Sequence, residues 1–351
     1  MIFSDKLSKL LEIGIAEDVF SSASCSLVGK DRIFIGYAGK IDKTNKVDEN
    51  TLFDLASLTK PLITSTLIIT AIGERKLTKK SILKSILPES IGTFWENTSI
   101  DELLQHISGL HDYRYLFLKY INKGGILLQS QQNKIKLLND ILRLSPVYSP
   151  GTKSLYSDFG FFILGIVLER LYNKPLNIIW EEKYKKYGFV FNPKEKKEFI
   201  PPTEIVLYRK EQLVKGEVHD EHAYLVGGVA GHAGAFASIS VISKFVKDIL
   251  YENVNGDFVD NYYGRLAHSD SVFADGWDKP AEKKSQAGNL IKTAIGHLGY
   301  TGTSLWVDFD REIGIILLTN RTFPSRFNRK IAQFRPNYYN KVIRLFDLDT
   351  I

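Results

Sequence analysis

Apolar residues near the start of the chain repeat at the spacing of a helix. Within residues 5–19, positions three and four apart are apolar, which puts them on one face of an amphipathic helix. These positions are Leu7, Leu10, Leu11 and Ile15. Residues 24–41 read instead as two β-rich runs around a turn at Gly29-Lys30-Asp31. The pattern therefore predicts a helix followed by a pair of strands.

The middle of the chain has helical patterning. A strongly apolar run follows Ser57 and reaches Ile72, which predicts a buried central helix that ends near Gly73. From residue 77 to about 200, segments of helical period dominate, and turn signals interrupt them at 149–151 and 173–175.

The pattern changes again after residue 220. The segment 227–238 is dense in glycine, and a helix is expected over 241–251. Residues 302–310 (GTSLWVDFD) and 312–320 (EIGIILLTN) are predicted to form paired strands around the turn at 310–312. A final helix is expected from about 330 to 345.

Strand patterns thus lie at both ends of the chain and helix patterns in the middle. The economical fold is an α/β (α+β) protein with one antiparallel sheet built from both ends and flanked by helices. We expect residues 1–70 and 225–351 to form this α/β domain, with residues 71–224 as a mainly helical inserted domain. The substrate-binding cleft should lie between the two, because pockets favour domain interfaces.

Composition places the chain among ordinary globular proteins. Its 351 residues suffice for one large domain or two, and the formal net charge of +6 arises from scattered lysines. The charge pattern therefore predicts no nucleic-acid partner. Cys25 is the only cysteine, so no intramolecular disulfide can form.

The N-terminal segment carries acidic residues and has no uninterrupted apolar stretch, so it does not read as a signal peptide. No stretch reaches 18 apolar residues without a charge, and no membrane span is expected. These features predict a cytoplasmic protein. A chain already trimmed of a signal, and hence periplasmic or extracellular, would look the same.

Ser57 and Lys60 stand three apart at the head of the apolar run. On a helix this spacing puts both on one face, so the lysine can reach the serine hydroxyl. A serine needs a base to become a nucleophile, and an apolar setting favours a neutral lysine that could serve as that base. The alternative is a helix cap at Ser57 with Lys60 solvated in the first turn, and this tetrapeptide alone favours the cap.

Two later stretches change the balance. In SPGTKSLYSDFGFFILG (149–165) a turn delivers Tyr156 and Asp158 just before an apolar helix. The plain alternative is Asp158 as a helix cap with Tyr156 packed beneath it. In AIGHLGYTGTSLWVDFD (294–310), Gly299 and Gly302 allow a strand edge to approach another backbone or a ligand; the alternative is a simple bulge.

Together the three stretches resemble the serine hydrolases of the penicillin-binding-protein and class C β-lactamase superfamily. S-x-x-K is the first motif of that superfamily. YSD (156–158) is similar to its second motif, Y-x-N, and HLG (297–299) to its third, K-T-G. LLQHISGLHDY (103–113) is similar to the L-L-x-H-x-S-G-L segment of the superfamily. GGVAGHAGAFAS (227–238) and GYTGTSLWVD (299–308) are typical of its esterase-like branch. The resemblance covers about residues 20–325 and implies a β-lactamase/transpeptidase-like fold.

The resemblance also implies roles. Ser57 would be the acylated nucleophile, Lys60 would take its proton, and Tyr156 would act as a second general acid or base. The backbone N–H groups of Ser57 and Tyr300 would form the oxyanion hole. No cofactor and no metal are implied, and the partner would be a small ester, amide or peptide substrate. The oligomeric state stays open.

Two residues depart from the superfamily pattern. Asp158 stands where asparagine is usual; it should lie near Lys60, favour its ammonium form and leave Tyr156 as the first base. His297 stands where lysine is usual, and a mostly neutral histidine should offer at best a single neutral donor. Both departures argue against β-lactam and D-Ala-D-Ala substrates.

Other candidate residues have plainer interpretations. His219, Asp220, Glu221 and His222 could suggest a metal site, but their spacing favours a pocket-lining or hinge role. His106 is expected to be structural. Trp277 is read either as an apolar wall at the pocket mouth or as a packed surface residue.

Three functional hypotheses remain. The leading one is a serine hydrolase that acts on esters or small amides through an acyl-enzyme. The second is a DD-peptidase or β-lactamase, or a muropeptide or D-amino-acid amidase. The third is a catalytically silent binding protein on the same fold, against which the intact set of Ser57, Lys60 and Tyr156 argues.

Overall fold

The architecture comes from a computed structural model, which describes residues 3–251, 262–269, 272–281, 285–290 and 293–349. A seven-stranded antiparallel sheet has the order β2-β1-β12-β11-β10-β9-β8. Its strands are β1 (Ser22–Val28), β2 (Ile33–Gly39), β8 (Phe273–Ala274), β9 (Trp277–Asp278), β10 (Ile295–Leu298), β11 (Ser304–Asp308) and β12 (Ile313–Thr319). Strands from the two ends of the chain pair directly, because β1 lies against β12 with Cys25 opposite Leu317.

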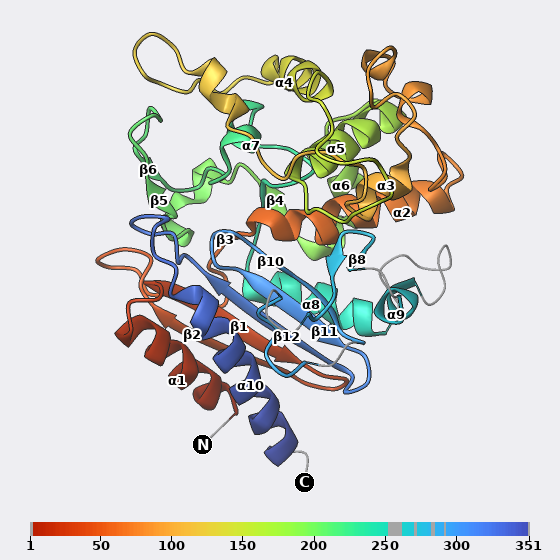
Figure 1. The fold of residues 1–351 in the computed structure, drawn as a ribbon. Coiled ribbons are helices and arrows are strands. Elements are labelled where there is room, and N and C mark those ends of the chain that lie inside the picture. The colour runs from red at the N-terminus through yellow and green to blue at the C-terminus, as the bar shows by residue number, and fades with distance from the viewer. Residues whose placement is uncertain (1–2, 252–261, 270–271, 282–284, 291–292, 350–351) are drawn as a thin grey trace.

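Helices cover both faces of this sheet (Figure 1). Helices α1 (Phe3–Ala16) and α10 (Ile331–Asp349) pack on one face, and α8 (Ile239–Leu250) packs on the other. The alternation of β12 explains this arrangement, since Ile315 and Leu317 join the core under α1 and α10 whereas Ile316 and Leu318 join the core that contains α8. The predicted strand pairs at 24–41 and 303–319 are confirmed, and so is the α+β fold with an antiparallel sheet.

The helices of the middle of the chain lie beyond the sheet, on the side away from α1 and α10 (Figure 1). These helices are α2 (Thr66–Gly73), α3 (Ile100–Leu104), α4 (Asn133–Leu142), α5 (Asp158–Tyr172), α6 (Leu176–Tyr184) and α7 (Glu221–Leu225). Helix α9 (Tyr262–Ala267) lies later in the chain. The domain division at residues 70 and 225 stays a prediction.

Short strands also occur outside the main sheet. A three-stranded sheet joins β3 (Phe53–Asp54), β7 (Ala235–Ala237) and β4 (Val190–Phe191), and β5 (Glu204–Ile205) pairs with β6 (Leu213–Val214). The strand β4 lies within the segment expected to be helical, and it pairs with β7, which separates it from β3, the strand that precedes Ser57.

The expected central helix begins irregularly. Residues Ala56–Leu58 form a 3₁₀ turn and Lys60–Ser65 a π-helical stretch, before α2 continues to Gly73. Pro61 lacks a backbone N–H, so the first turns cannot form the regular α-helical ladder. The stretch Ala56–Gly73 is the one helical segment among the described residues with the length and hydropathy of a membrane span, and 83% of it is buried in the protein.

Candidate active site

A strained turn presents Ser57 at the head of the central helix. Ala56 has a left-handed backbone with φ of 47°, a conformation that costs free energy in a non-glycine residue and concentrates at functional sites. The carboxylate of Asp54 holds this turn, because one oxygen accepts the N–H of Ala56 at 2.8 Å and the other accepts the N–H of His219 at 2.6 Å. Asp54 is a positioning residue that the sequence patterns did not single out.

Lys60 lies beneath Ser57 with its side chain fully buried. Its Nζ lies 3.0 Å from Ser57 Oγ, 2.6 Å from Asp158 Oδ1 and 3.3 Å from the carbonyl oxygen of His232. Nζ donates hydrogen bonds to Ser57 and His232, and its contact with Asp158 is an ion pair. The structure thus places Asp158 beside Lys60, as expected.

Tyr156 completes the group around the nucleophile. Its hydroxyl is hydrogen-bonded to Ser57, and Lys60 Nζ lies 4.7 Å from the centre of its ring. Burial raises the pKa of Tyr156 well above 10, and the carboxylate of Asp158 raises it further. The resting phenol is therefore neutral, and its conjugate phenoxide would be a strong base.

His106 positions this tyrosine. The imidazole Nδ1 accepts the N–H of Ser157 at 3.0 Å, and the ring packs 4.9 Å from the ring of Tyr156. Nδ1 therefore carries no proton, and burial lowers the pKa of His106 well below 6.5, which keeps the ring neutral. His106 thus has the expected structural role, and its contacts hold Tyr156 and Ser157 of the second motif in place.

Helix α5 begins at Asp158, but Asp158 is not its cap. Ser157 is the N-cap, since its hydroxyl accepts the N–H of Gly160 at 3.3 Å and donates to the carbonyl of His111 at 2.6 Å. The alternative interpretation of Asp158 as the cap is wrong. The cap at Ser157 leaves the carboxylate of Asp158 available to Lys60.

His297 lies on β10 at the border of the same cavity, with its side chain almost fully buried. Its Nδ1 lies 2.9 Å from the carbonyl oxygen of Leu298. A carbonyl only accepts, so Nδ1 must carry the proton and Nε2 bears a lone pair. Burial, and next the charge of Lys60, lower the pKa of His297 to about 3. His297 is therefore neutral, as predicted. The prediction that it offers the cavity a donor is wrong, because its free nitrogen is an acceptor.

Gly299 brings the end of β10 against the nucleophile turn. A Cβ on this residue would lie 2.7 Å from the carbonyl oxygen of Leu55 and would overlap Thr303 Oγ1. The absence of a side chain at Gly299 therefore lets β10 approach the backbone of the nucleophile turn, and Gly299 also borders the larger cavity. The next N–H, that of Tyr300, has no acceptor among the residues that the structure describes.

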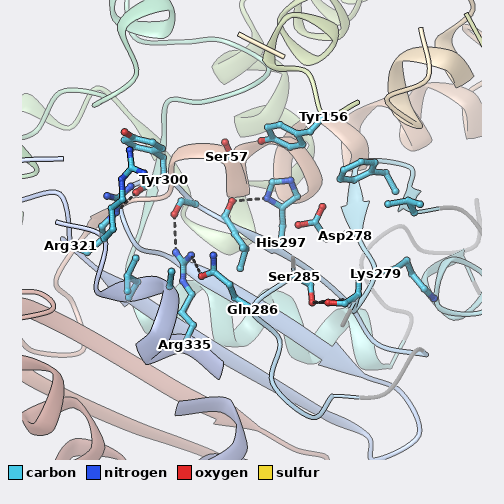
Figure 2. Close-up of a pocket in the computed structure, with 18 of the residues that line it drawn as sticks. Ser57, Tyr156, Asp278, Lys279, Ser285, Gln286, His297, Tyr300, Arg321 and Arg335 are labelled. Carbon is cyan, nitrogen blue, oxygen red and sulfur yellow. Dashed lines mark hydrogen bonds between the residues drawn. The ribbon is translucent and has the colours of Figure 1, made fainter. Parts of the chain in front are cut away.

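Two cavities meet at Ser57. The larger, about 570 Å³, is bordered by Ser57, Tyr156, His297 and Asp278 on one side (Figure 2). Basic side chains border the other side, namely Arg321, Arg326, Arg329 and Arg335. The smaller, about 320 Å³, is bordered mainly by acidic and aromatic groups, including Asp112, Asp158, Asp220, Glu221, Tyr113 and Tyr115. Substrate can therefore extend from Ser57 in two directions.

The stretch at 276–280 contributes Asp278 rather than Trp277. Trp277 is fully buried in the core, its ring 6.0 Å from that of Tyr263. Neighbouring residues of a strand point to opposite faces, so the partly buried Asp278 faces the cavity instead. The prediction of Trp277 as a pocket wall or a surface residue is wrong, and strand alternation was the signal that could have found Asp278.

The acidic and histidine stretch at 219–222 forms polar pairs beside the site. His219 Nε2 lies 2.8 Å from Glu204, Asp220 lies 2.8 Å from Nε2 of His232, and Glu221 lies 2.6 Å from Arg326. These pairs border the smaller cavity, which fits the pocket-lining interpretation. Within the described part of the chain, no group of three or more His, Cys, Asp or Glu side chains could hold a metal ion.

This fold and this constellation define a serine hydrolase of the type formed by penicillin-binding proteins and class C β-lactamases. The chain belongs to the beta-lactamase family, whose model matches residues 15–337. It is 28% identical to the N-acetylmuramyl-L-alanine amidase of Bacillus subtilis (strain 168), over 90% of this chain and 80% of that protein. It is 29% identical to a putative D-alanyl-D-alanine carboxypeptidase of Salmonella typhimurium, over 87% of this chain and 78% of that protein.

Solved structures show the same fold at lower identity. The octameric penicillin-binding protein homologue from Pyrococcus abyssi superposes with a TM-score of 0.74 at 17% identity, over 97% of this chain and 77% of that one. EstCE1, a hydrolase with promiscuous acyltransferase activity, superposes with a TM-score of 0.74 at 18% identity, over 96% and 98%. These likenesses carry the fold assignment.

Proposed function

We propose that this protein hydrolyses esters or small amides through an acyl-enzyme on Ser57. The observation that carries the proposal is the convergence on Ser57, whose Oγ is 3.0 Å from Lys60 Nζ and hydrogen-bonded to the hydroxyl of Tyr156. A serine between a cation and a phenol has both a stabiliser for its alkoxide and a group that can exchange a proton.

The proton balance assigns the roles. Lys60 is paired with the Asp158 carboxylate and donates to the carbonyl of His232, and as an ammonium it stabilises negative charge on Ser57 Oγ. Tyr156 first loses its phenol proton to solvent; as a phenoxide it then accepts the Ser57 proton while Oγ bonds to the carbonyl carbon. The same phenol then gives that proton to the departing alcohol or amine. In the second half, Tyr156 takes a proton from water, the water oxygen bonds to the acyl carbon, and the Oγ–acyl bond breaks as Tyr156 returns that proton to Ser57 Oγ.

Two backbone donors would stabilise the tetrahedral intermediate. The N–H of Ser57 lies at the start of a helical segment, and the N–H of Tyr300 follows Gly299 at the end of β10. Both belong to segments that Gly299 holds in close contact. Removal of one such donor typically costs about 100-fold or more in rate.

A muropeptide amidase or carboxypeptidase activity is the second candidate. Relatives with these names match most of this chain, and two cavities on either side of Ser57 can hold an extended amide substrate. This candidate differs from the first in the size of the substrate and not in the chemistry at Ser57.

A hydrolysis panel tests the proposal. p-Nitrophenyl esters, nitrocefin, D-Ala-D-Ala peptides and an N-acetylmuramyl-L-alanine peptide should be compared on the wild type and on Ser57→Ala. We expect ester or amide turnover and fluorophosphonate labelling of the wild type, both lost in Ser57→Ala. A folded wild type that is neither labelled nor active on any substrate would favour the silent binding protein.

We also propose a cytoplasmic location, based on the acidic N-terminal segment, with a periplasmic or extracellular location as the alternative. Cell fractionation with an antibody against the protein separates these.

A further inference from the structure

The third motif presents unsatisfied acceptors to the larger cavity. His297 Nε2 bears a lone pair, because Nδ1 donates to Leu298, and its side chain is only 1% exposed. Among the described residues, Nε2 has no hydrogen-bond partner. A buried polar atom without a partner costs free energy, and such atoms in folded proteins call for an explanation.

Asp278 supplies a second acceptor on the same wall. It lies on β9 opposite Gly296, one residue before His297 in the paired strand. Its Oδ1 is buried and is also without a partner in the described part of the chain. Burial raises the pKa of Asp278 to about 7, against an opposing effect of Lys60. Figure 2 shows the carboxyl group and the imidazole side by side at the cavity, with Ser57 and Tyr156 close by.

We propose that His297 Nε2 and Asp278 form a subsite that binds an uncharged hydrogen-bond donor of the substrate, an amide N–H or a hydroxyl, next to the scissile carbonyl. The inference rests on the proposed hydrolase function and adds the substrate feature that the site selects. A donor between the two groups would satisfy both orphaned acceptors at once.

Charged groups fit this subsite less well. A carboxylate has only acceptors, so it would leave His297 Nε2 unsatisfied, and it would be repelled by Asp278 when that group is ionised. An ammonium would share the cavity with basic side chains on its opposite wall, Arg321, Arg326 and Arg329 among them, and with Lys60 behind the nucleophile. A neutral donor avoids both penalties.

Matched substrates test the subsite on the intact protein. N-acetylglycine p-nitroanilide carries an N–H that N-acetylsarcosine p-nitroanilide lacks, and glycoloyl p-nitroanilide carries an O–H that methoxyacetyl p-nitroanilide lacks. We expect kcat/KM to be about tenfold or more higher for the donor member of at least one pair, because a site built to bind a donor rejects the analogue without it. The pair that shows the difference identifies whether the subsite binds an amide N–H or a hydroxyl of the substrate.

Variants separate hydrogen bonding from the size of the added methyl group. His297→Phe and Asp278→Leu keep an approximate side-chain volume but remove the acceptor, and the ratio within the pair should fall towards one. Val272→Ala, an exposed apolar position on the same cavity, should keep the wild-type ratio. Fluorophosphonate labelling of Ser57 reports whether each variant is folded.

Two results would overturn the subsite. One is a wild-type ratio within twofold of unity in both pairs, which needs no variant. The other is a high ratio that persists in folded His297→Phe and Asp278→Leu, which would show a steric effect. Both differ from a failure of the proposed function, in which the wild type neither is labelled nor turns over any anilide, and which would overturn both proposals.

Discussion

The Nζ of Lys60 lies 2.6 Å from Oδ1 of Asp158, where the superfamily pattern has an uncharged asparagine. The lysine side chain is fully buried and the carboxylate is 18% exposed, so solvent screens this pair only weakly. The contact pairs the lysine with a counter-charge, which opposes its use as a neutral base. It also puts a negative charge close to Tyr156, the group left to accept the Ser57 proton.

The first prediction concerns pH. Burial and then Asp158 raise the pKa of Tyr156, and the active form of this base is the deprotonated one, so activity is lost as pH falls. Asp158→Asn removes a negative charge, lowers the pKa of Tyr156 and should shift the acidic limb of log kcat/KM downward by about one pH unit. Because this pKa lies well above 10, log kcat/KM for ester hydrolysis should rise with pH throughout the range from pH 5 to 10, and the shift is measured as the displacement of this sloping line along the pH axis.

Asp112→Asn is the matched control, because Asp112 borders the neighbouring cavity but is exposed. The acidic limb of log kcat/KM should lie at the same pH in Asp112→Asn as in the wild type. An unmoved limb in Asp158→Asn would show that Asp158 does not govern the base.

The second prediction concerns stability. Lys60→Met leaves the Asp158 carboxylate without its partner, and loss of one member of a buried pair costs roughly 3–5 kcal/mol. Since Asp158 is 18% exposed, we expect a smaller loss of about 2–3 kcal/mol in the free energy of unfolding. The double variant with Asp158→Asn should recover about 1 kcal/mol or more of this. Urea denaturation decides, and a double variant no more stable than Lys60→Met would mean that the ion pair is not the cause.

Much of the fold followed from periodicity. The strands at 24–41 and 303–319 alternate in a way that packing then uses, as Ile315 and Ile316 show by facing different cores. Short strands such as β4 escaped prediction, because two residues carry no measurable period and their pairing with β7 depends on tertiary contact.

The site was predictable where a motif fixed the residue type. Ser57, Lys60, Tyr156 and Asp158 lie together in the structure. The tautomer of His297 was not predictable, since it depends on the carbonyl of Leu298 that the strand happens to present. Asp54 and Asp278 were missed for a similar reason, because their roles come from backbone turns and strand pairing that bring distant segments together.

The third prediction concerns Gly299. A Cβ there would lie 2.7 Å from the carbonyl of Leu55 and would overlap Thr303, so Gly299→Ala must push β10 away from the nucleophile turn. We expect a loss of about 1–3 kcal/mol in stability and, because the N–H of Tyr300 moves with the strand, a fall of about 100-fold in kcat. Gly29→Ala is the control, since the nearest atom to a Cβ there is 3.8 Å away. Equal kcat in the two variants would show that Gly299 does not set the position of the oxyanion-hole donors.

The last prediction concerns substrate charge. His297 stays neutral from pH 5 to 8, because burial and Lys60 hold its pKa at about 3, and its free nitrogen is an acceptor. Two of the nearby arginines are engaged within the protein, since Arg326 lies 2.6 Å from both Glu204 and Glu221 and Arg321 donates to three backbone carbonyls. A substrate carboxylate therefore lacks the charged donor that lysine would supply at this position.

We accordingly expect kcat/KM for p-nitrophenyl acetate or butyrate to exceed that for nitrocefin in the wild type at every pH between 5 and 8. His297→Lys restores a cation to the strand and should raise nitrocefin turnover relative to the ester by about tenfold, because charge-assisted hydrogen bonds are roughly twice as strong as neutral ones. His297→Gln, which supplies an amide donor without a charge, should leave the relative rates near those of the wild type. Steady-state kinetics on the two substrates settles the preference: faster turnover of nitrocefin than of the esters by the wild type would contradict it, because the carboxylate would then be bound without a cation at residue 297.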